Sequence, residues 1–396
     1  MHYRGSTVLS FFLITGMTAA FAAKPPLDCS KKSLAEAVAD VKGPGETILF
    51  TGVCSGPVVI RTDGLTLAGV GSAIVDGAGA GDSVTIAGAH GVSLTNFEIR
   101  NGVNGILGVN GAHFDLTGVN THDNLVFGIS LQTASSAVLS GVTTSRNGVH
   151  GLDLETGSAA AINGVFTTSN NRVFGINVNG SSITFSRATV SATGNALGIQ
   201  VATGGNAFLN DSATVLNVTD NHATGLTVVS GAHMVSFGGT INVSGNPVNG
   251  VSVNSKGGLD LDAGSTLNIF NNGQDGLVLQ EASVMTVFNI PQFSGVPGFS
   301  TVNSHNNTGN GISVKSGSTL TLSNQARILS NANTGTGFIS DNASATLVNS
   351  NITGNGLKDL QLTFGSRADL QSLIFGSYGC DTTVLVRGTS GITCPH

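Results

Sequence analysis

One short phrase recurs along the chain and restricts its fold more than any other feature. It reads Asn-x-x-x-Gly-(apolar)-x-(apolar), and successive copies lie 22 to 27 residues apart, with one longer interval of 35 residues. A repeat of this length predicts one structural unit per copy, each packed on the next. The glycine position of the phrase is occupied by Gly105, Gly128, Gly151, Gly175, Gly198, Gly225, Gly250, Gly276, Gly311 and Gly337, and finally by Asp359.

The residues that follow each glycine alternate between apolar and polar side chains. Leu152 and Leu154, for example, flank Asp153. A period of two predicts a strand with one buried face. No repeat has room for a helix beside its strands, so equivalent strands of successive repeats must stack in parallel. The sequence therefore predicts an all-β coil of about 13 or 14 turns, roughly 65 Å long at the usual strand spacing.

A column of asparagines is predicted at one corner of this coil. Asparagine tolerates left-handed backbone angles, and its amide can bond to the asparagine of the next turn. We expect these residues to be structural. The column consists of Asn101, Asn124, Asn147, Asn171, Asn195, Asn221, Asn246, Asn272, Asn307, Asn333 and Asn355.

Residues 28–394 resemble the right-handed parallel β-helix proteins of the pectate-lyase-like superfamily. "LAEAVADV" (Leu34–Val41) is similar to the short helix that caps the first coil in that family, and "GETILFTGVCSGPVVI" is similar to its first coils. The resemblance implies a single domain over residues 24–396, with an N-terminal cap at 28–56, repeats at 57–365 and a C-terminal cap at 366–396. It leaves the function open, because this fold carries lyases, hydrolases, epimerases, adhesins and structural proteins.

The first 23 residues are typical of a secretory signal peptide. Arg4 precedes an apolar run from Val8 to Met17, and small residues end the segment at Ala23. A retained N-terminal anchor is the alternative. No later segment has 18 uninterrupted apolar residues, so the rest of the chain is predicted to lack a membrane span. We expect a secreted or periplasmic protein.

The four cysteines form one close pair at each end of the chain. In an oxidising compartment they predict two local disulfides, because the other two connectivities would join opposite ends. Their spacing matches no metal-ligand pattern, and we expect neither a metal nor a cofactor. The net charge of −6 argues against a nucleic-acid partner. The predicted pairs, which would also help to cover the exposed strand edges at the two ends, are Cys29–Cys54 and Cys380–Cys394.

A candidate catalytic pair lies in "RNGVHGLDLETG", where Asp153 and Glu155 are predicted to share a solvent-exposed face about 6.5 Å apart along one strand. Two carboxyl groups at that separation could serve as acid and base in an inverting glycoside hydrolase. The alternative is a solvated face, since Arg100, Asp123 and Arg146 alternate in sign nearby, which suits simple charge pairing. Candidate binding residues around the pair are Gln132, His150, Asn177, Asn179 and Arg172.

Two further features could contact a ligand. Phe127, His150, Phe174 and Leu197 fall in one column, which predicts either an aromatic strip for sugar rings or a filled corner of the core. The longest repeat contains "NIPQFSGVPGF" (Asn289–Phe299), which predicts a protruding loop. This loop either contacts a partner near Lys315, Gln280 and Glu281 or is a tolerated insertion.

Three classes of function remain open. The clustered aspartates of pectate lyases are absent, as are the Asn-Thr-Asp, Asp-Asp and Arg-Ile-Lys motifs of polygalacturonases. We therefore favour a secreted protein that binds a polysaccharide or a cell-surface partner. The alternatives are a polysaccharide-processing hydrolase, lyase or epimerase that uses Asp153 and Glu155, and a structural or adhesive rod.

Overall fold

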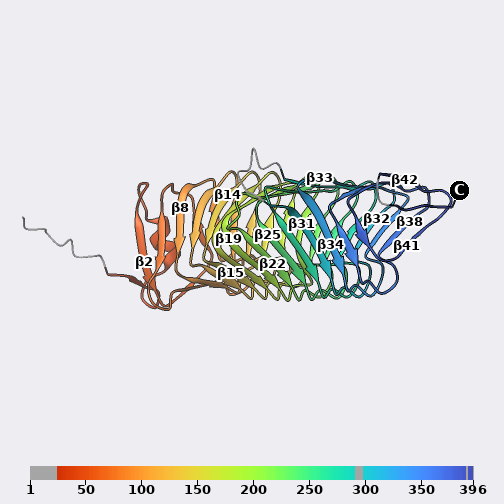
Figure 1. The fold of residues 1–396 in the computed structure, drawn as a ribbon. Coiled ribbons are helices and arrows are strands. Elements are labelled where there is room, and N and C mark those ends of the chain that lie inside the picture. The colour runs from red at the N-terminus through yellow and green to blue at the C-terminus, as the bar shows by residue number, and fades with distance from the viewer. Residues whose placement is uncertain (1–24, 290–297, 389–390, 396) are drawn as a thin grey trace, which may run out of the picture.

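The computed structural model describes residues 25–289, 298–388 and 391–395. The segment predicted as a signal peptide and most of the predicted Asn289–Phe299 loop lie outside these residues. The described chain forms 42 β-strands and one α-helix, and it winds into an elongated rod that runs from its N-terminal end to its C-terminal end (Figure 1). The predicted fold class, an all-β parallel β-helix with a short N-terminal helix, is confirmed.

Two parallel sheets make up the rod. One sheet has 14 strands, one from each turn, which agrees with the predicted number of coils. In order along the rod these strands are β4 (Val58–Ile60), β7 (Val84–Ala87), β10 (Ile106–Val109), β13 (Ile129–Leu131), β16 (Leu152–Leu154), β18 (Phe174–Asn179), β20 (Leu197–Ala202), β23 (Leu226–Val228), β26 (Val251–Val253), β29 (Leu277–Leu279), β32 (Ile312–Lys315), β35 (Phe338–Asp341), β38 (Leu360–Thr363) and β41 (Tyr378–Cys380).

The second sheet has 28 strands, because most turns contribute two strands to it. In the turn that begins with β10, these are β11 (His113–Thr117) and β12 (Asn120–His122). Two turns run through both columns as single bent strands, β17 (Ala159–Ser169) and β19 (Ser182–Thr193), and these strands make one continuous sheet of the two columns.

The predicted register is confirmed down the length of the 14-stranded sheet. Ile129 pairs with Leu152 and Leu152 pairs with Ile176, so the apolar residue after each phrase glycine stacks on its counterpart. Together with the apolar residues of the 28-stranded sheet, these side chains fill the inside of the coil. The largest fully buried side chains include Phe50, Phe114, Phe166, Phe185 and Phe338.

The asparagine column forms a hydrogen-bonded ladder inside the corner that precedes the 14-stranded sheet. From Asn147 onward, each Oδ1 accepts two bonds from the asparagine one turn earlier, as when Asn147 accepts from the backbone nitrogen and Nδ2 of Asn124 at 3.2 and 2.9 Å. The ladder ends where Asn355 donates to Asp359. Its members are Asn124, Asn147, Asn171, Asn195, Asn221, Asn246, Asn272, Asn307, Asn333 and Asn355.

Two details of the predicted column are wrong. Asn101 is not a member, because the backbone nitrogen of Gly102 donates to Asn124 in its place. The left-handed residue of the corner is the one before each ladder asparagine, such as Asp123 (φ 55°) or Arg146 (φ 52°). The ladder side chain must point inward to reach its neighbours, so the left-handed turn falls one residue earlier.

The ladder also explains the glycine of the phrase. A β-carbon on Gly128 would lie 2.7 Å from Nδ2 of Asn147 and 2.7 Å from the carbonyl oxygen of Gly151. Any larger residue would therefore displace either the amide ladder or the neighbouring backbone.

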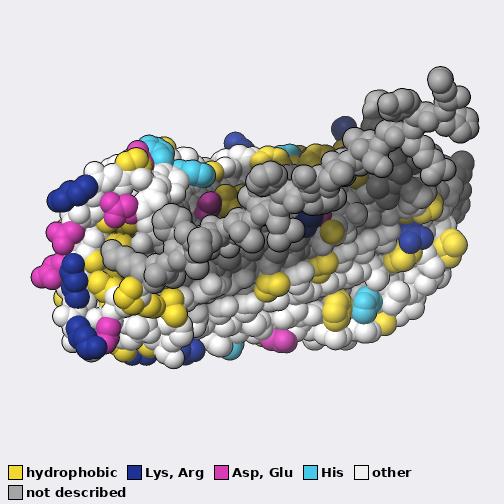
Figure 2. All heavy atoms as spheres, turned by 90° about the vertical axis from the view of Figure 1, so that its left-hand side faces the viewer, with side chains coloured by type: hydrophobic (Ala, Val, Ile, Leu, Met, Phe, Trp, Pro, Cys, Tyr) yellow, Lys and Arg dark blue, Asp and Glu magenta, His cyan; other side chains and the backbone are white. Residues whose placement is uncertain are grey.

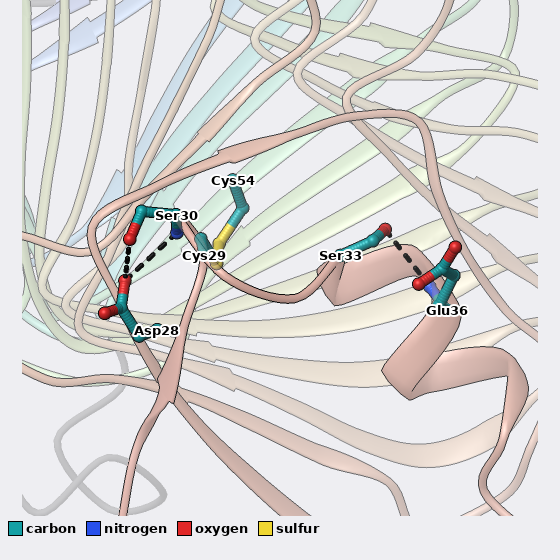
Figure 3. The surroundings of a disulfide bond; sticks show 6 residues. All are labelled: Asp28, Cys29, Ser30, Ser33, Glu36 and Cys54. Atoms are coloured by element: carbon teal, nitrogen blue, oxygen red, sulfur yellow. Dashed lines mark hydrogen bonds between the residues drawn. A yellow bond between two sulfur atoms is a disulfide. The ribbon is translucent and has the colours of Figure 1, made fainter.

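The N-terminal end is closed by a helix and a disulfide. Helix α1 (Leu34–Ala39) begins after Ser33, whose side chain accepts a hydrogen bond from the backbone nitrogen of Glu36, and it buries Leu34 and Val38 over the first turn (Figure 3). The Cys29–Cys54 disulfide ties this cap to strand β3 (Val53–Ser55). The Cys380–Cys394 disulfide joins the last turn to the C-terminal segment, so both predicted disulfides are present.

The N-terminal end carries a group of charged side chains. Figure 2 looks onto this end and shows Lys, Arg, Asp and Glu side chains gathered along one side of it. Ion pairs join Lys31 to Asp28 (3.1 Å) and Lys32 to Asp40 (3.6 Å). Charged side chains and a helix over an open strand edge oppose pairing with other chains.

Candidate functional site

The predicted catalytic and binding residues meet on the outer face of the 14-stranded sheet. The pairing of β13, β16, β18 and β20 aligns Ser130, Asp153, Asn177 and Gln200 in one row, one residue per turn. The side chains of this row point away from the core of the coil. The sequence therefore predicted the register of the row correctly.

The expectation that Asp153 is exposed to solvent is wrong. Its side chain is fully buried, and Ser130 and Asn177 beside it are 0% and 5% exposed. The alternation of side chains predicts which way a residue points, whereas the packing of its neighbours decides whether water reaches it.

The hydrogen bonds of the row satisfy only part of the Asp153 carboxyl group. Asn177 donates to Oδ1 at 2.8 Å, and Gln200 in turn donates to Asn177 at 3.5 Å. Oδ2 is buried and has no hydrogen-bond partner among the described residues. Burial raises the pKa of Asp153 from its ordinary 3.8 to about 7; repulsion from Glu155 adds to this, while hydrogen bonds from Asn177 and Ser130 oppose it. Near neutral pH this carboxyl group exists in both protonation states.

His150 lies against the same carboxyl group without a close hydrogen bond to it. Its Nδ1 accepts from the backbone nitrogen of Phe174 at 3.1 Å, so the neutral ring carries its proton on Nε2, which lies 3.9 Å from Oδ1 of Asp153. Burial lowers the pKa of His150 from 6.5 to about 4. A neutral imidazole therefore faces a carboxyl group that burial holds partly protonated.

The predicted aromatic column exists beside Asp153. His150 lies between Phe127 and Phe174, with ring centroids 5.3 and 5.0 Å away. His150 is buried, and the two phenylalanine rings are half-buried. Rings that contact one another and are largely removed from solvent favour the second alternative drawn from the sequence, a filled corner.

The other predicted site residues lie around the edges of the row. Gln132 is half-buried and donates to Ser130 at 3.1 Å, and Glu155 and Asn179 are half-buried at the opposite edge from the aromatic column. Arg172 is exposed at the corner and makes no ion pair within the described residues. The structure thus brings Asp153, His150 and Asn177 into contact and leaves Arg172 apart from them.

The expected charge alternation is only half correct. Arg146 pairs with Asp123 at 2.8 Å, and the hydrogen bond from this arginine lowers the pKa of Asp123 to about 2. Arg100 instead pairs with Asp76 and Glu98, at 2.9 and 3.0 Å. Arg100 aligns with His122 across the sheet, so Asp123 lies one residue beyond its reach.

No group of three or more His, Cys, Asp or Glu side chains that could hold a metal ion occurs within residues 25–289, 298–388 and 391–395. The same residues contain no helix that is long and apolar enough to cross a membrane.

An open polar pocket lies further along the same face, where the sequence predicted only a possible contact near Lys315 and Gln280. Its volume is about 370 Å³. Lys315 pairs with Asp275 at 3.5 Å, and Ser313 donates to Asp275 at 2.7 Å. Asp275 stands directly before a phrase glycine, in the column of His150, and that position could have identified it. The polar lining consists of Asn249, Gln274, Asp275, Gln280, Thr308 and Lys315.

The fold matches solved β-helix structures at low sequence identity. An alginate lyase from Paenibacillus sp. str. FPU-7 is 15% identical with a TM-score of 0.49, covering 63% of this chain and 97% of its own. The A-module of an Azotobacter vinelandii mannuronan C-5 epimerase is 15% identical with a TM-score of 0.42, covering 89% and 93%. Pectate lyase Pel9A is 14% identical with a TM-score of 0.24, covering 89% and 72%.

No protein-family model and no curated protein matches the chain. The predicted resemblance to pectate-lyase-like β-helices is confirmed for the fold by the parallel strand pairing of the chain's own two sheets, and this fold by itself assigns no activity.

Proposed function

We propose that this protein binds a polysaccharide along the outer face of the 14-stranded sheet. The supporting observation is the open polar pocket, because it offers amide, hydroxyl and ammonium groups to solvent on one face. A chain laid parallel to the rod would meet one new set of side chains about every 4.8 Å. Hydroxyl-rich ligands suit such a lining, since each sugar can both donate and accept hydrogen bonds.

The ligand would extend from Lys315 and Gln280 toward the predicted binding residues at the other end of the face. The pocket lies five turns from Asp153, roughly 24 Å at the usual strand spacing. Gln132, Asn179 and Arg172 would then contact the far part of the chain. His150 and Asn177 would support that part from below, because both are buried.

Affinity electrophoresis against acidic and neutral polysaccharides tests this proposal. A Gln280→Ala/Lys315→Ala variant should lose retardation by the bound polysaccharide. Gln361→Ala/Lys358→Ala is a matched control, because it changes the same residue types at the same face outside the pocket. Equal retardation of all three proteins, or no retardation of the wild type by any polysaccharide, would contradict the proposal.

A second candidate function is catalysis at Asp153, favoured by its partly protonated carboxyl group. Such a group can act as a general acid near neutral pH. Glu155, at the edge of the same row, would be the second carboxyl group. Release of reducing ends or unsaturated uronates by the wild type, lost in Asp153→Asn and in Glu155→Gln, would support this function. Activity that survives both substitutions would exclude these residues.

We also propose that the protein works outside the cytoplasm. Two disulfides support this location, because structural disulfides persist in oxidising compartments. Cell fractionation followed by thiol counting under denaturing conditions tests it. Four free thiols in a cytoplasmic fraction would contradict the proposal.

A further inference from the structure

A second cavity lies on a different face of the rod, on the 28-stranded sheet near its C-terminal end. Its volume is about 380 Å³. Strands β33 (Thr319–Asn324), β36 (Ser344–Val348), β39 (Arg367–Gln371) and β42 (Leu385–Gly388) form its floor. The polar residues that line it are Thr319, Ser344, Thr346, Arg367, Asp369 and Arg387.

The strand register arranges these side chains in two neighbouring columns. Ser344 stands opposite Arg367, while Thr346 stands opposite Asp369, which in turn stands opposite Arg387. Arg367 and Arg387 are therefore diagonal neighbours, a separation of about 7–8 Å between backbone positions that long side chains span easily. Both guanidinium groups can reach one ligand group placed between them.

Neither guanidinium group has an ion pair or a side-chain hydrogen bond within the described chain. Arg100 and Arg146, in contrast, are each held by carboxylates at 3.0 Å or less. Arg367 and Arg387 are both exposed at the cavity. Two unpaired guanidinium groups that line one cavity attract an oxyanion, and their planar forks match a carboxylate especially well.

The other polar residues that line the cavity indicate that the same ligand also carries hydroxyl groups. Asp369 stands opposite Arg387 and two residues after Arg367 on the same strand. It repels a free inorganic anion, but it accepts a hydrogen bond from a sugar hydroxyl. Ser344 and Thr346 can donate as well as accept. The cavity volume is also within the range of small-molecule sites and much larger than a single inorganic ion needs.

We propose that this cavity binds an acidic saccharide unit. Its carboxylate lies between Arg367 and Arg387, and its hydroxyl groups bond to Asp369, Ser344 and Thr346. The site is on a different sheet from the polar pocket of the proposed function, so each proposal can fail without the other.

Ligand-observed saturation-transfer NMR and calorimetry on the purified protein test this inference. The probes are galacturonate and glucuronate, with galactose and glucose as uncharged counterparts and inorganic phosphate and sulfate as free anions. We expect both uronates to bind and the uncharged sugars not to bind. Arg367→Gln and Arg387→Gln should each weaken uronate binding about tenfold or more, since each removes a charge-assisted hydrogen bond.

Matched variants separate the site from general effects of charge. Arg61→Gln removes an exposed arginine at the other end of the rod that makes no ion pair within the described residues, and it should leave binding unchanged. The Gln361→Ala/Lys358→Ala variant of the other face should bind uronates normally. Asp369→Asn should strengthen phosphate binding, because it removes a charge that repels free anions while its amide oxygen still accepts a hydrogen bond from a sugar hydroxyl.

Three results would overturn the proposal. The first is the absence of uronate binding by a correctly folded wild type. The second is uronate binding that survives in the Arg367→Gln/Arg387→Gln double variant. The third is binding of phosphate and sulfate but not of uronates, which would reduce the cavity to a site for inorganic anions.

Discussion

Two rows of buried polar side chains run along the same rod, but they differ in how completely their polar atoms are hydrogen-bonded. In the corner ladder, each amide bonds to the amides of the neighbouring turns. Asn195 accepts two hydrogen bonds from Asn171 and donates to Asn221 and to the carbonyl oxygen of Thr168. The row on the outer face of the 14-stranded sheet contains Asp153, whose Oδ2 is buried without a hydrogen-bond partner in the described part of the chain.

The contrast shows that repetition alone does not distinguish structural from functional polarity. An asparagine column can satisfy itself, because every amide both donates and accepts. A lone carboxylate in a column of neutral groups cannot, and burial raises the pKa of Asp153 instead. An incompletely satisfied group is costly to keep, so we regard the Asp153 row as the better candidate for function.

The largest expected effect comes from interrupting the corner ladder. Asn195→Ala removes four hydrogen bonds and leaves buried donors and acceptors unpaired, so it should lower the free energy of unfolding by about 5 kcal/mol. Chemical denaturation followed by circular dichroism measures this change. A loss below about 1 kcal/mol would mean that the ladder is not a main source of stability.

The next effect distinguishes Asp153 from the ladder by its dependence on pH. Because the folded-state pKa is raised, this carboxyl group contributes stability that is complete below about pH 4 and is lost as the pH rises through 7. Asp153→Asn should abolish that loss, which is on the order of 4 kcal/mol between pH 4 and pH 8. Denaturation at both pH values measures it. An identical pH dependence in wild type and variant would contradict the burial of a titrating carboxyl group.

His150 should show the opposite sign and a slightly smaller effect. Its folded-state pKa is lowered to about 4, so its contribution is present above pH 6.5 and is lost as the pH falls toward 4. His150→Gln should therefore stabilise the protein relative to wild type at pH 4.5, by on the order of 3 kcal/mol, with little difference at pH 8. Stabilisation that is equal at both pH values would point to packing rather than to protonation.

The smallest effect is expected from a second, outer row of asparagines on the 28-stranded sheet. Asn242 donates to Asn217 and accepts from Asn268, at 2.9 and 2.8 Å, but its side chain is only partly buried. Water can replace these bonds, so Asn242→Ala should cost less than about 1 kcal/mol. A loss as large as that of Asn195→Ala would show that hydrogen bonding between turns matters independently of burial.

Much of the fold could be predicted because the repeat constrains it many times over. Each copy of the phrase places an apolar pair on one strand, and the pairing of Leu152 with Ile129 and Ile176 follows from that spacing. The disulfide pairs were also predictable because each is local in sequence, and the capping helix was expected from the resemblance of Leu34–Val41 to the family's cap. The exclusion of Asn101 from the asparagine ladder was not predictable, because a shift of one residue at a corner of the coil leaves the repeated sequence phrase unchanged.

The candidate site was predictable only in part. The row of Ser130, Asp153 and Asn177 followed from the register, but its burial did not. The pocket around Asp275 and Lys315, and the cavity between Arg367 and Arg387, join residues whose sequence neighbours give no sign of a site. Their side chains meet only because successive turns stack.

The sequence by itself determined the coil, its strand register and its corner column, because these depend on a period that every repeat restates. Only the tertiary structure decided which polar residues are buried, which charges find partners and where the surface is hollow. These properties depend on side chains from several turns packing together, and no single repeat contains that information. The raised pKa of Asp153, and the lack of ion pairs at Arg367 and Arg387 within the described residues, are therefore properties of the stacked rod.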